Sequence, residues 1–228
     1  MLTWLTTPRA SPWLLLAWSK PLTALPPHRK NKDTMTESTS TKTFPLHDAL
    51  AGRRSPRAYS RSAELTPEQV GPLFEAARWS PSSSNSQPWS FVVGFRGDAV
   101  FSTILGTLAS GNAVWAEHAS ALVANITRTH TDEGKALSHA WYDLGQAVAH
   151  LSVQATVEGI LVHQMGGFDA EALGSALGLD EHHRVVTVMT LGVQGDVSDL
   201  PENLQEREQA PRLRTPLGEL VSGSAHYA

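Results

Sequence analysis

The expected fold is organised around one polar stretch, Ser80-Pro81-Ser82-Ser83-Ser84-Asn85-Ser86-Gln87-Pro88-Trp89, which runs directly into the apolar Phe91-Val92-Val93. We call residues 80–89 the polar shelf. Hydroxyl and amide groups at this density need hydrogen-bond partners wherever the chain is ordered. A flexible serine-rich linker is the alternative interpretation, but linkers seldom end in Gln-Pro-Trp followed by a buried strand. We therefore expect an ordered shelf on a rigid scaffold.

Helical and strand patterns extend outward from the shelf in both directions. Thr66-Pro67 is typical of a helix start, because threonine caps the first N–H groups and proline suits the first helical position. Gly52 ends a shorter helix upstream. Downstream, apolar runs alternate with helical patterns, and residues 201–209 are polar and expected to form a loop. The predicted strands are 89–95, 121–126, 159–162 and 184–192, and the predicted helices 46–52, 66–79, 99–108, 136–158 and 170–177.

The helix predicted over residues 136–158 is the longest element. It contains no proline, and its apolar side chains lie on nearly every side. Its length would be about 35 Å, yet Asp143, His150 and other polar groups argue against a membrane span. One small domain can hardly cover such a helix on all sides, so we expect a buried central helix in an α+β fold, partly covered by a second copy of the chain in a homodimer.

Arginines gather at two places far apart in the chain. Arg53, Arg54 and Arg57 follow the helix stop at Gly52, with Ser55 between them. This loop is either a phosphate clamp or a solvated basic turn paired with carboxylates. Arg212 and Arg214 point the same way in an extended segment, so they could close on the same anion as Arg53 or decorate a tail.

Paired glycines follow the strand predicted at 159–162. Gly166 and Gly167 could allow a flat ligand to approach main-chain N–H groups, although a plain turn into the next helix would use the same residues. His182 and His183 are adjacent and would project to opposite sides of a strand. A metal site at these histidines is therefore not expected.

Composition narrows the class of protein. The 228 residues are 41% hydrophobic and 18% charged, with a net charge of -4 and no cysteine. This is globular composition without the excess of basic residues that nucleic-acid binding needs, and it excludes thiolate chemistry. Residues 1–40 are proline-broken and then Ser/Thr-rich, so we expect a disordered extension, with Met35 as an alternative start, before a domain over 41–228. We expect a cytoplasmic protein that binds neither nucleic acid nor membrane.

Familiar nucleotide and hydrolase motifs are absent: there is no Gly-Lys-Thr/Ser phosphate loop, G-x-G-x-x-G fingerprint or G-x-S-x-G elbow. Between residues 44 and 221, however, the chain resembles the nitroreductase family of FMN-dependent oxidoreductases. Four motifs in the correct order carry the resemblance: residues 53–59, residues 81–89, residues 166–169 and Arg212-x-Arg214-x-Pro216. The resemblance implies a mixed sheet flanked by helices, a long central helix at a dimer interface, and one FMN in each of two sites between subunits.

The same resemblance implies a set of cofactor-binding residues drawn from all four motifs. Arg53, Ser55 and Arg214, helped by Arg212, would hold the FMN phosphate and ribityl oxygens. Arg57 would lie beside flavin N1 and O2, and the partner subunit would supply the shelf groups. The Gly167 N–H would reach flavin N5. The complete set is Arg53, Arg54, Ser55, Arg57, Ser82, Ser83, Asn85, Gln87, Gly166, Gly167, Arg212 and Arg214.

The activity implied is hydride transfer from NAD(P)H through the flavin to a nitroaromatic, a quinone or a similar small-molecule acceptor. An FMN-binding protein without turnover, a flavin-consuming or dehalogenating enzyme, and a plain dimeric interaction protein are the alternatives. The stretch Trp115-Ala116-Glu117-His118-Ala119 departs from members with polar groups near the flavin. Donor preference therefore stays open, and Trp115 could cover the pocket or pack in the core.

Overall fold

The computed structural model describes residues 44–223, so the extension expected over residues 1–40 lies outside the described residues. The chain divides into a compact unit, Lys42–Thr215, and a second unit to which Pro216 and the residues after it belong. The second unit contributes one described helix, α8 (Leu217–Leu220). All remaining elements belong to the first unit.

The first unit is built on a four-stranded sheet in the order β1-β2-β4-β3. All three strand pairings are antiparallel, whereas a mixed sheet was expected. β2 and β3 do run in the same direction, but β4 is inserted between them and pairs antiparallel with both. The α+β class with flanking helices is confirmed. The strands are β1 (Trp89–Phe95), β2 (Ala121–Arg128), β3 (Leu161–Met165) and β4 (His183–Gly192).

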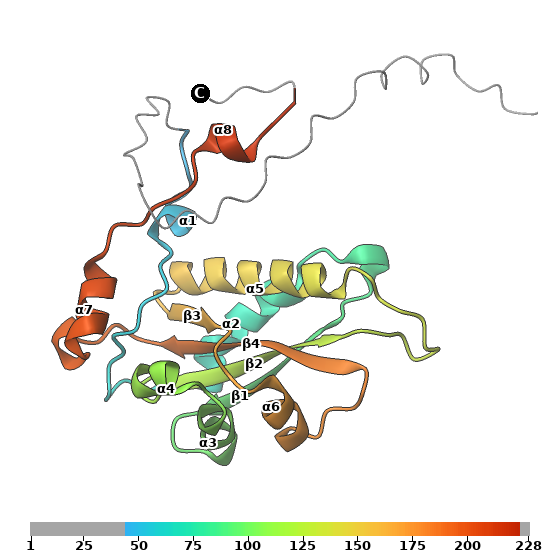
Figure 1. Cartoon of the computed structure of the whole chain (residues 1–228), viewed down its shortest axis with the longest axis horizontal. Helices are drawn as coiled ribbons and strands as arrows, with labels where there is room; N and C mark the ends of the chain where they lie inside the picture. The colour runs from blue at the N-terminus through green and yellow to red at the C-terminus, as the bar shows by residue number, and fades with distance from the viewer. Residues whose placement is uncertain (1–43, 224–228) are drawn as a thin grey trace, which may run out of the picture. The chain divides into compact units, whose positions relative to one another are not determined.

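Helices cover both faces of this sheet. Figure 1 shows α2 and α5 on one face and α3, α4 and α6 on the other. The helices are α1 (Asp48–Gly52), α2 (Pro67–Arg78), α3 (Ala99–Gly106), α4 (Ser110–Ala116), α5 (Ala140–Val157), α6 (Ala170–Ala176) and α7 (Glu202–Gln209), with short 3-10 turns at η2 (Ser83–Asn85) and η3 (Val197–Asp199).

The strand β2 lies between the two halves of the core. Its alternate side chains point to opposite faces, so Leu122 and Ile126 pack with Ile104 of α3, and Val123 packs with Leu144 of α5. A strand buried on both faces needs apolar side chains at consecutive positions, and this explains its continuous hydrophobic run.

The central helix α5 differs from its prediction in length and in burial. It begins at Ala140 because residues 129–139 form a turned-back loop, in which Thr131 N–H donates to the Lys135 carbonyl at 2.8 Å. Eighteen residues give a length of about 27 Å. Trp141 and Tyr142 are 52% and 68% exposed, so the first unit by itself does not cover this helix on every side.

Two helices of the first unit were not predicted, and neither was α8 of the second unit. Residues 201–209 were expected to be a loop, but Glu202–Gln209 forms α7, in which only Leu204 is buried. A helix with one apolar anchor has too little periodicity to be recognised from sequence. α4 was also missed, and β3 continues to Met165, so His163 lies in a strand and not in the following turn. None of the described helices is long and apolar enough to cross a lipid bilayer.

Candidate functional site

A cavity of about 230 Å³ brings the two arginine-rich segments together. One wall is the loop that follows α1, and the other is α7 with the extended segment behind it. The structure thus places Arg53, Ser55, Arg212 and Arg214 around one space, although about 160 residues separate the two segments. The full lining is Arg53, Arg54, Ser55, Arg57, Arg207, Glu208, Ala210, Pro211, Arg212 and Arg214.

Arg212 holds the two segments together. One guanidinium nitrogen donates to the carbonyl oxygen of Arg53 at 2.7 Å, and the other donates to the carbonyl of Ala51. These carbonyls lie at the end of α1, where helix geometry leaves acceptors without intrahelical partners. The Arg212 guanidinium is therefore engaged with backbone carbonyls of the first segment. The Arg53 guanidinium donates instead to the Ser55 hydroxyl at 3.2 Å.

The arginines repel one another inside this cavity. Burial lowers the pKa of the Arg53 guanidinium, and the neighbouring charges of Arg214 and Arg212 lower it further. Six arginines and one carboxylate line the space. An anion in the cavity would relieve this repulsion, and a phosphate group suits the fork of a guanidinium.

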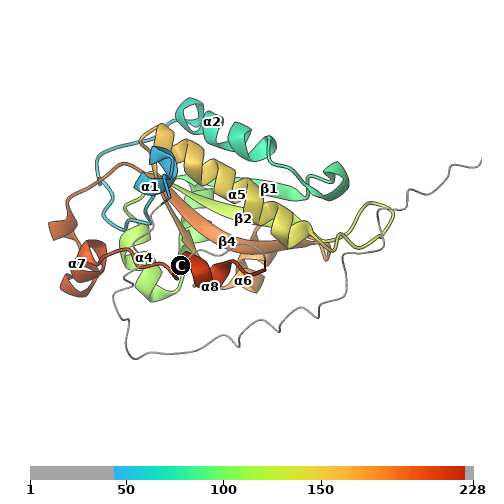
Figure 2. The same cartoon turned by 90° about the horizontal axis from the view of Figure 1, so that it is seen from above.

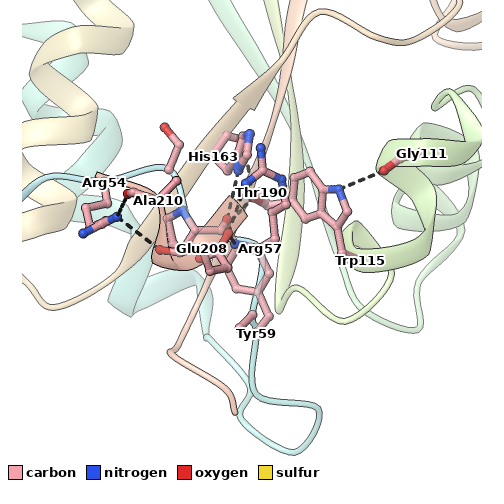
Figure 3. A network of polar contacts seen from close by, with 12 residues as sticks. Arg54, Arg57, Tyr59, Gly111, Trp115, His163, Thr190, Glu208 and Ala210 are labelled. Carbon is pink, nitrogen blue, oxygen red and sulfur yellow. Dashed lines mark hydrogen bonds and ion pairs between the residues drawn. The ribbon is translucent and has the colours of Figure 1, made fainter. Parts of the chain in front are cut away.

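Arg57 is paired, in contrast to the neighbours that repel one another. Its backbone N–H and its guanidinium both donate to the same oxygen of Glu208, at 3.1 Å each. The guanidinium also lies 5.9 Å from the centre of the Trp115 ring. Arg54 donates to the carbonyls of Glu208 and Ala210 (Figure 3). Residues 53–57, which we call the cationic loop, are therefore attached to α7 at several points.

His163 fastens the cationic loop to the sheet. Its Nδ1 lies 2.9 Å from the carbonyl oxygen of Pro56, and since that oxygen can only accept, Nδ1 carries the proton. Burial lowers the pKa of His163 to about 4; the charges of Arg57 and Arg53 act in the same direction, and the Pro56 carbonyl opposes them. His163 is therefore neutral near pH 7.

Buried aromatic and hydroxyl groups lie next to Arg57 and His163. The Trp115 side chain is 1% exposed, its indole N–H donates to the carbonyl of Gly111 at 3.1 Å, and its ring centre lies 4.6 Å from that of His163. The Tyr59 hydroxyl lies 2.6 Å from the Thr190 hydroxyl, and burial raises its pKa. In the described chain Trp115 is thus a core residue beside the site (Figure 3).

The paired glycines Gly166 and Gly167 directly follow β3 and lie beside α4. The carbonyl of Gly167 accepts hydrogen bonds from the Asn112 side chain and the Ala109 N–H, both at 3.0 Å. A Cβ atom on Gly167 would lie 2.8 Å from the Asn112 amide nitrogen, so a larger residue here would displace the Asn112 side chain. Its N–H meets no acceptor among the described residues, which leaves it available to a ligand. Sequence analysis did not identify Asn112 as a site residue, because it did not predict α4, the helix that contains Asn112.

The polar shelf is ordered, as predicted, and its backbone is strained. Ser84, Asn85 and Gln87 have φ values of 52°, 55° and 44°, which are uncommon for residues other than glycine. The N–H of Ser83 donates to the buried Asp143 carboxylate at 3.1 Å, and the Gln87 N–H donates to the Ser82 hydroxyl at 3.0 Å. Such strain persists where surrounding contacts enforce it, and it is concentrated at functional sites.

The shelf, between α2 and β1, and α1, which precedes the arginine loop, lie at opposite ends of α5 (Figure 2). Asp143, which holds the shelf, is in the first turn of α5. At the other end, a Cβ atom on Gly52 would lie 3.9 Å from the Thr156 methyl group. Thirteen helical residues correspond to about 20 Å. A single chain therefore does not bring Ser82, Ser83, Asn85 and Gln87 to the arginines.

Comparison with known sequences gives one family. The model of the nitroreductase family matches residues 50–114. A Mycolicibacterium smegmatis protein, described only as an uncharacterised 15.4 kDa protein in the ask 5' region, is 36% identical over 139 residues, which are 58% of this chain and 92% of that protein. YdgI of Bacillus subtilis, provisionally named an NAD(P)H nitroreductase, is 25% identical over 67% of this chain and 88% of its own length.

Solved structures agree with this result. An oxidoreductase containing FMN superposes with a TM-score of 0.76 at 31% identity, over 84% of this chain and 98% of that one. An Exiguobacterium sibiricum protein, provisionally named a nitroreductase and crystallised with FMN, superposes with a TM-score of 0.65 over 82% of this chain and 100% of its own. Its 19% identity supports a likeness of fold alone.

Proposed function

The chain belongs to the nitroreductase family, and from this premise we propose that it is an FMN-dependent oxidoreductase that uses NAD(P)H to reduce nitroaromatic, quinone or similar acceptors. The observation that carries the proposal is the arginine cavity, which Arg53, Arg212 and Arg214 line as like charges. Bound FMN would supply the centre that accepts and donates hydride.

The cavity fits the phosphate end of FMN. Arg53 and Arg214 present guanidinium groups, and Ser55 adds a hydroxyl that Arg53 already orients. Arg212 is engaged with backbone carbonyls, so its role would be to fix the loop and add positive charge. Two charged hydrogen-bonding groups on a dianion give affinity and orientation without any chemical step by the protein.

The other parts of the site would position the ring system. The Gly167 N–H is available, and Asn112 fixes the carbonyl of the same residue, so this N–H is a suitable hydrogen-bond donor to the edge of a flavin. The shelf residues Ser82, Ser83 and Asn85 would contribute polar groups from a second subunit. The buried Trp115 ring packs on His163 and lies 5.9 Å from the Arg57 guanidinium, so it would keep water from the inner side of Arg57.

One face of α5 supports the proposed dimer. Trp141, Gly145, Ala149, Val153 and Val157 recur every four residues, and all but the half-buried Val153 are exposed in the single chain. A stripe of this kind, small in its centre, suits close packing against another helix. Antiparallel pairing about Ala149 would bring the shelf of each subunit to the partner's arginine cavity. The dimer would thus combine two groups that lie about 20 Å apart in a single chain.

The test begins with the purified protein. We expect a flavin absorbance spectrum, release of FMN on denaturation, a dimeric mass in light scattering, and NADH or NADPH oxidation that requires an added quinone or nitroaromatic. Bound FMN without any oxidation of either nucleotide would indicate a flavin-binding protein without turnover. Protein that contains no flavin and takes up none would refute the assignment.

A further inference from the structure

Glu208 is the one carboxylate among the described residues that line the arginine cavity. It lies near the end of α7, a helix with little apolar anchoring, and its side chain is 11% exposed. A single oxygen of this carboxylate accepts both the backbone N–H and the guanidinium of Arg57. The proposed phosphate ligands therefore share their cavity with a resident negative charge.

Such a carboxylate has two opposing effects on an anion that enters the cavity. It fixes Arg57 through two hydrogen bonds, which favours a preorganised site. It also cancels one positive charge and repels the entering anion, and this Coulomb effect is larger in a half-buried site than in bulk water. In the absence of a ligand, the same carboxylate pairs directly with Arg57 at 3.1 Å, while Arg214 and Arg212 act on the buried Arg53 as like charges.

We propose that Glu208 is the resident counter-ion of this cavity: a positioning residue that stabilises Arg57 when no anion is bound and weakens the binding of FMN through its phosphate. The inference rests on the proposed function for the identity of the ligand. It differs from a purely structural ion pair between α7 and the loop, because a structural pair would affect stability alone.

The substitution Glu208→Gln separates charge from hydrogen bonding, because the glutamine oxygen can still accept from Arg57. We expect FMN affinity to rise by about fivefold, the scale of one like charge removed from a partly screened site. Inorganic phosphate should likewise bind more tightly to the FMN-free Glu208→Gln protein than to the FMN-free native protein. The variant should also unfold at a lower temperature than the native protein when no anion is present. Added phosphate should remove this difference in unfolding temperature.

The matched control is Glu206→Gln, which removes the same charge from an exposed position on α7. It should bind FMN and phosphate as the native protein does. Glu208→Ala, which also removes the acceptor for Arg57, should bind FMN less tightly than Glu208→Gln.

Two results would overturn the proposal. The first is FMN and phosphate affinity in Glu208→Gln that is unchanged or reduced, or raised no more than in Glu206→Gln. The second is a Glu208→Gln protein that stays unfolded even with phosphate present, because an added anion should replace the lost counter-ion. If the native protein takes up no FMN, the proposed function fails, whereas the phosphate titration still reports on Glu208.

Discussion

The two ends of α5, which we propose to contact the same ligand, differ in their physical character. At the end near Thr156, like charges are concentrated in a cavity, and Arg53 is destabilised by its own neighbours. At the end near Asp143, the groups are uncharged and the backbone is strained, with three residues at positive φ. One end stores electrostatic energy that an anion can release, and the other fixes the directions of hydroxyl and amide groups.

The contrast explains why neither end is a complete site. Charge repulsion supplies affinity for a phosphate but little specificity for a ring system. Oriented polar groups supply specificity but little affinity in water. Since about 20 Å separates the two ends in one chain, the pairing of two chains is the step that would combine them. The predictions below test this division, from the largest effect to the smallest.

The largest effect is expected from Ala149→Arg, at the centre of the exposed stripe on α5. A charge placed in a helix interface is costly to bury, so the variant should be monomeric. It should lose FMN affinity by more than about 100-fold, although the arginine cavity remains intact, because the shelf of the partner is no longer present. Light scattering and an FMN fluorescence titration measure the two quantities.

Ala176→Arg is the control for this prediction, since Ala176 is exposed on α6 and lies on the other face of the sheet. It should remain dimeric and bind FMN normally. A monomeric Ala149→Arg protein with native FMN affinity would show that one end of α5 suffices, and the comparison between the two ends would lose its basis.

Next in size are Arg53→Ala and Arg214→Ala, which remove charge from the cavity. Each should weaken FMN binding by about 1.5–3 kcal/mol, which corresponds to about tenfold to 150-fold in Kd. The dimer should persist, because neither residue lies on the stripe of α5. Arg184→Ala, at an exposed position on β4, is the charge-matched control. Native flavin occupancy in both cavity variants would remove the phosphate assignment.

Acid should destabilise the folded protein by protonating His163, which holds the cationic loop to the sheet. Its pKa is about 4 in the folded protein and about 6.5 in an unfolded chain, so between these values the unfolded state binds the proton and the folded state does not. The free energy of unfolding should therefore fall as pH decreases from 6.5 to 4, by up to about 3 kcal/mol. Urea unfolding across this range measures the loss.

His163→Asn isolates this contribution, because its side-chain amide can still donate to the Pro56 carbonyl but does not titrate. The variant should show a flatter pH dependence than the native protein. An identical slope in His163→Asn and the native protein would mean that other groups cause the acid sensitivity.

The smallest effects are expected on the shelf. Ser84→Gly should stabilise the protein by about 1 kcal/mol, because glycine adopts a φ of 52° without strain. It should leave FMN binding unchanged. Asn85→Gly should stabilise less, since asparagine tolerates positive φ, and it should weaken FMN binding through the lost amide. Chemical denaturation and FMN titration compare the two variants; equal FMN affinity in both would exclude Asn85 from the site.

Sequence analysis succeeded where the signal was local. The start of α2 was correct because Thr66 and Gln69 cap each other's N–H groups within four residues. The bounds of β1 were correct because the polar shelf and the turn at Gly97 limit it on both sides. The grouping of Arg53 with Arg212 and Arg214 came from the family motifs, since their spacing along the chain gives no distance in space.

It failed where tertiary contacts replace local preference. α7 has a polar sequence, yet it is held by the pairing of Glu208 with Arg57 and by Arg54 on its last carbonyls. The direction of β4 between β2 and β3 depends on which strands meet, and no single strand encodes it. Asn112 and His163 were missed because each acts on a backbone carbonyl remote in the sequence.

By itself, the sequence determined the apolar patterns that form the sheet and α5, the caps that place the helix ends, and the concentration of arginines in two segments. These properties are set by near neighbours along the chain, so they can be predicted without a fold. Only the tertiary structure decided that the arginines share one cavity, that Glu208 enters it as a counter-charge, and that the shelf lies at the far end of α5. Coulomb and hydrogen-bond energies depend on distance in space, and folding sets that distance.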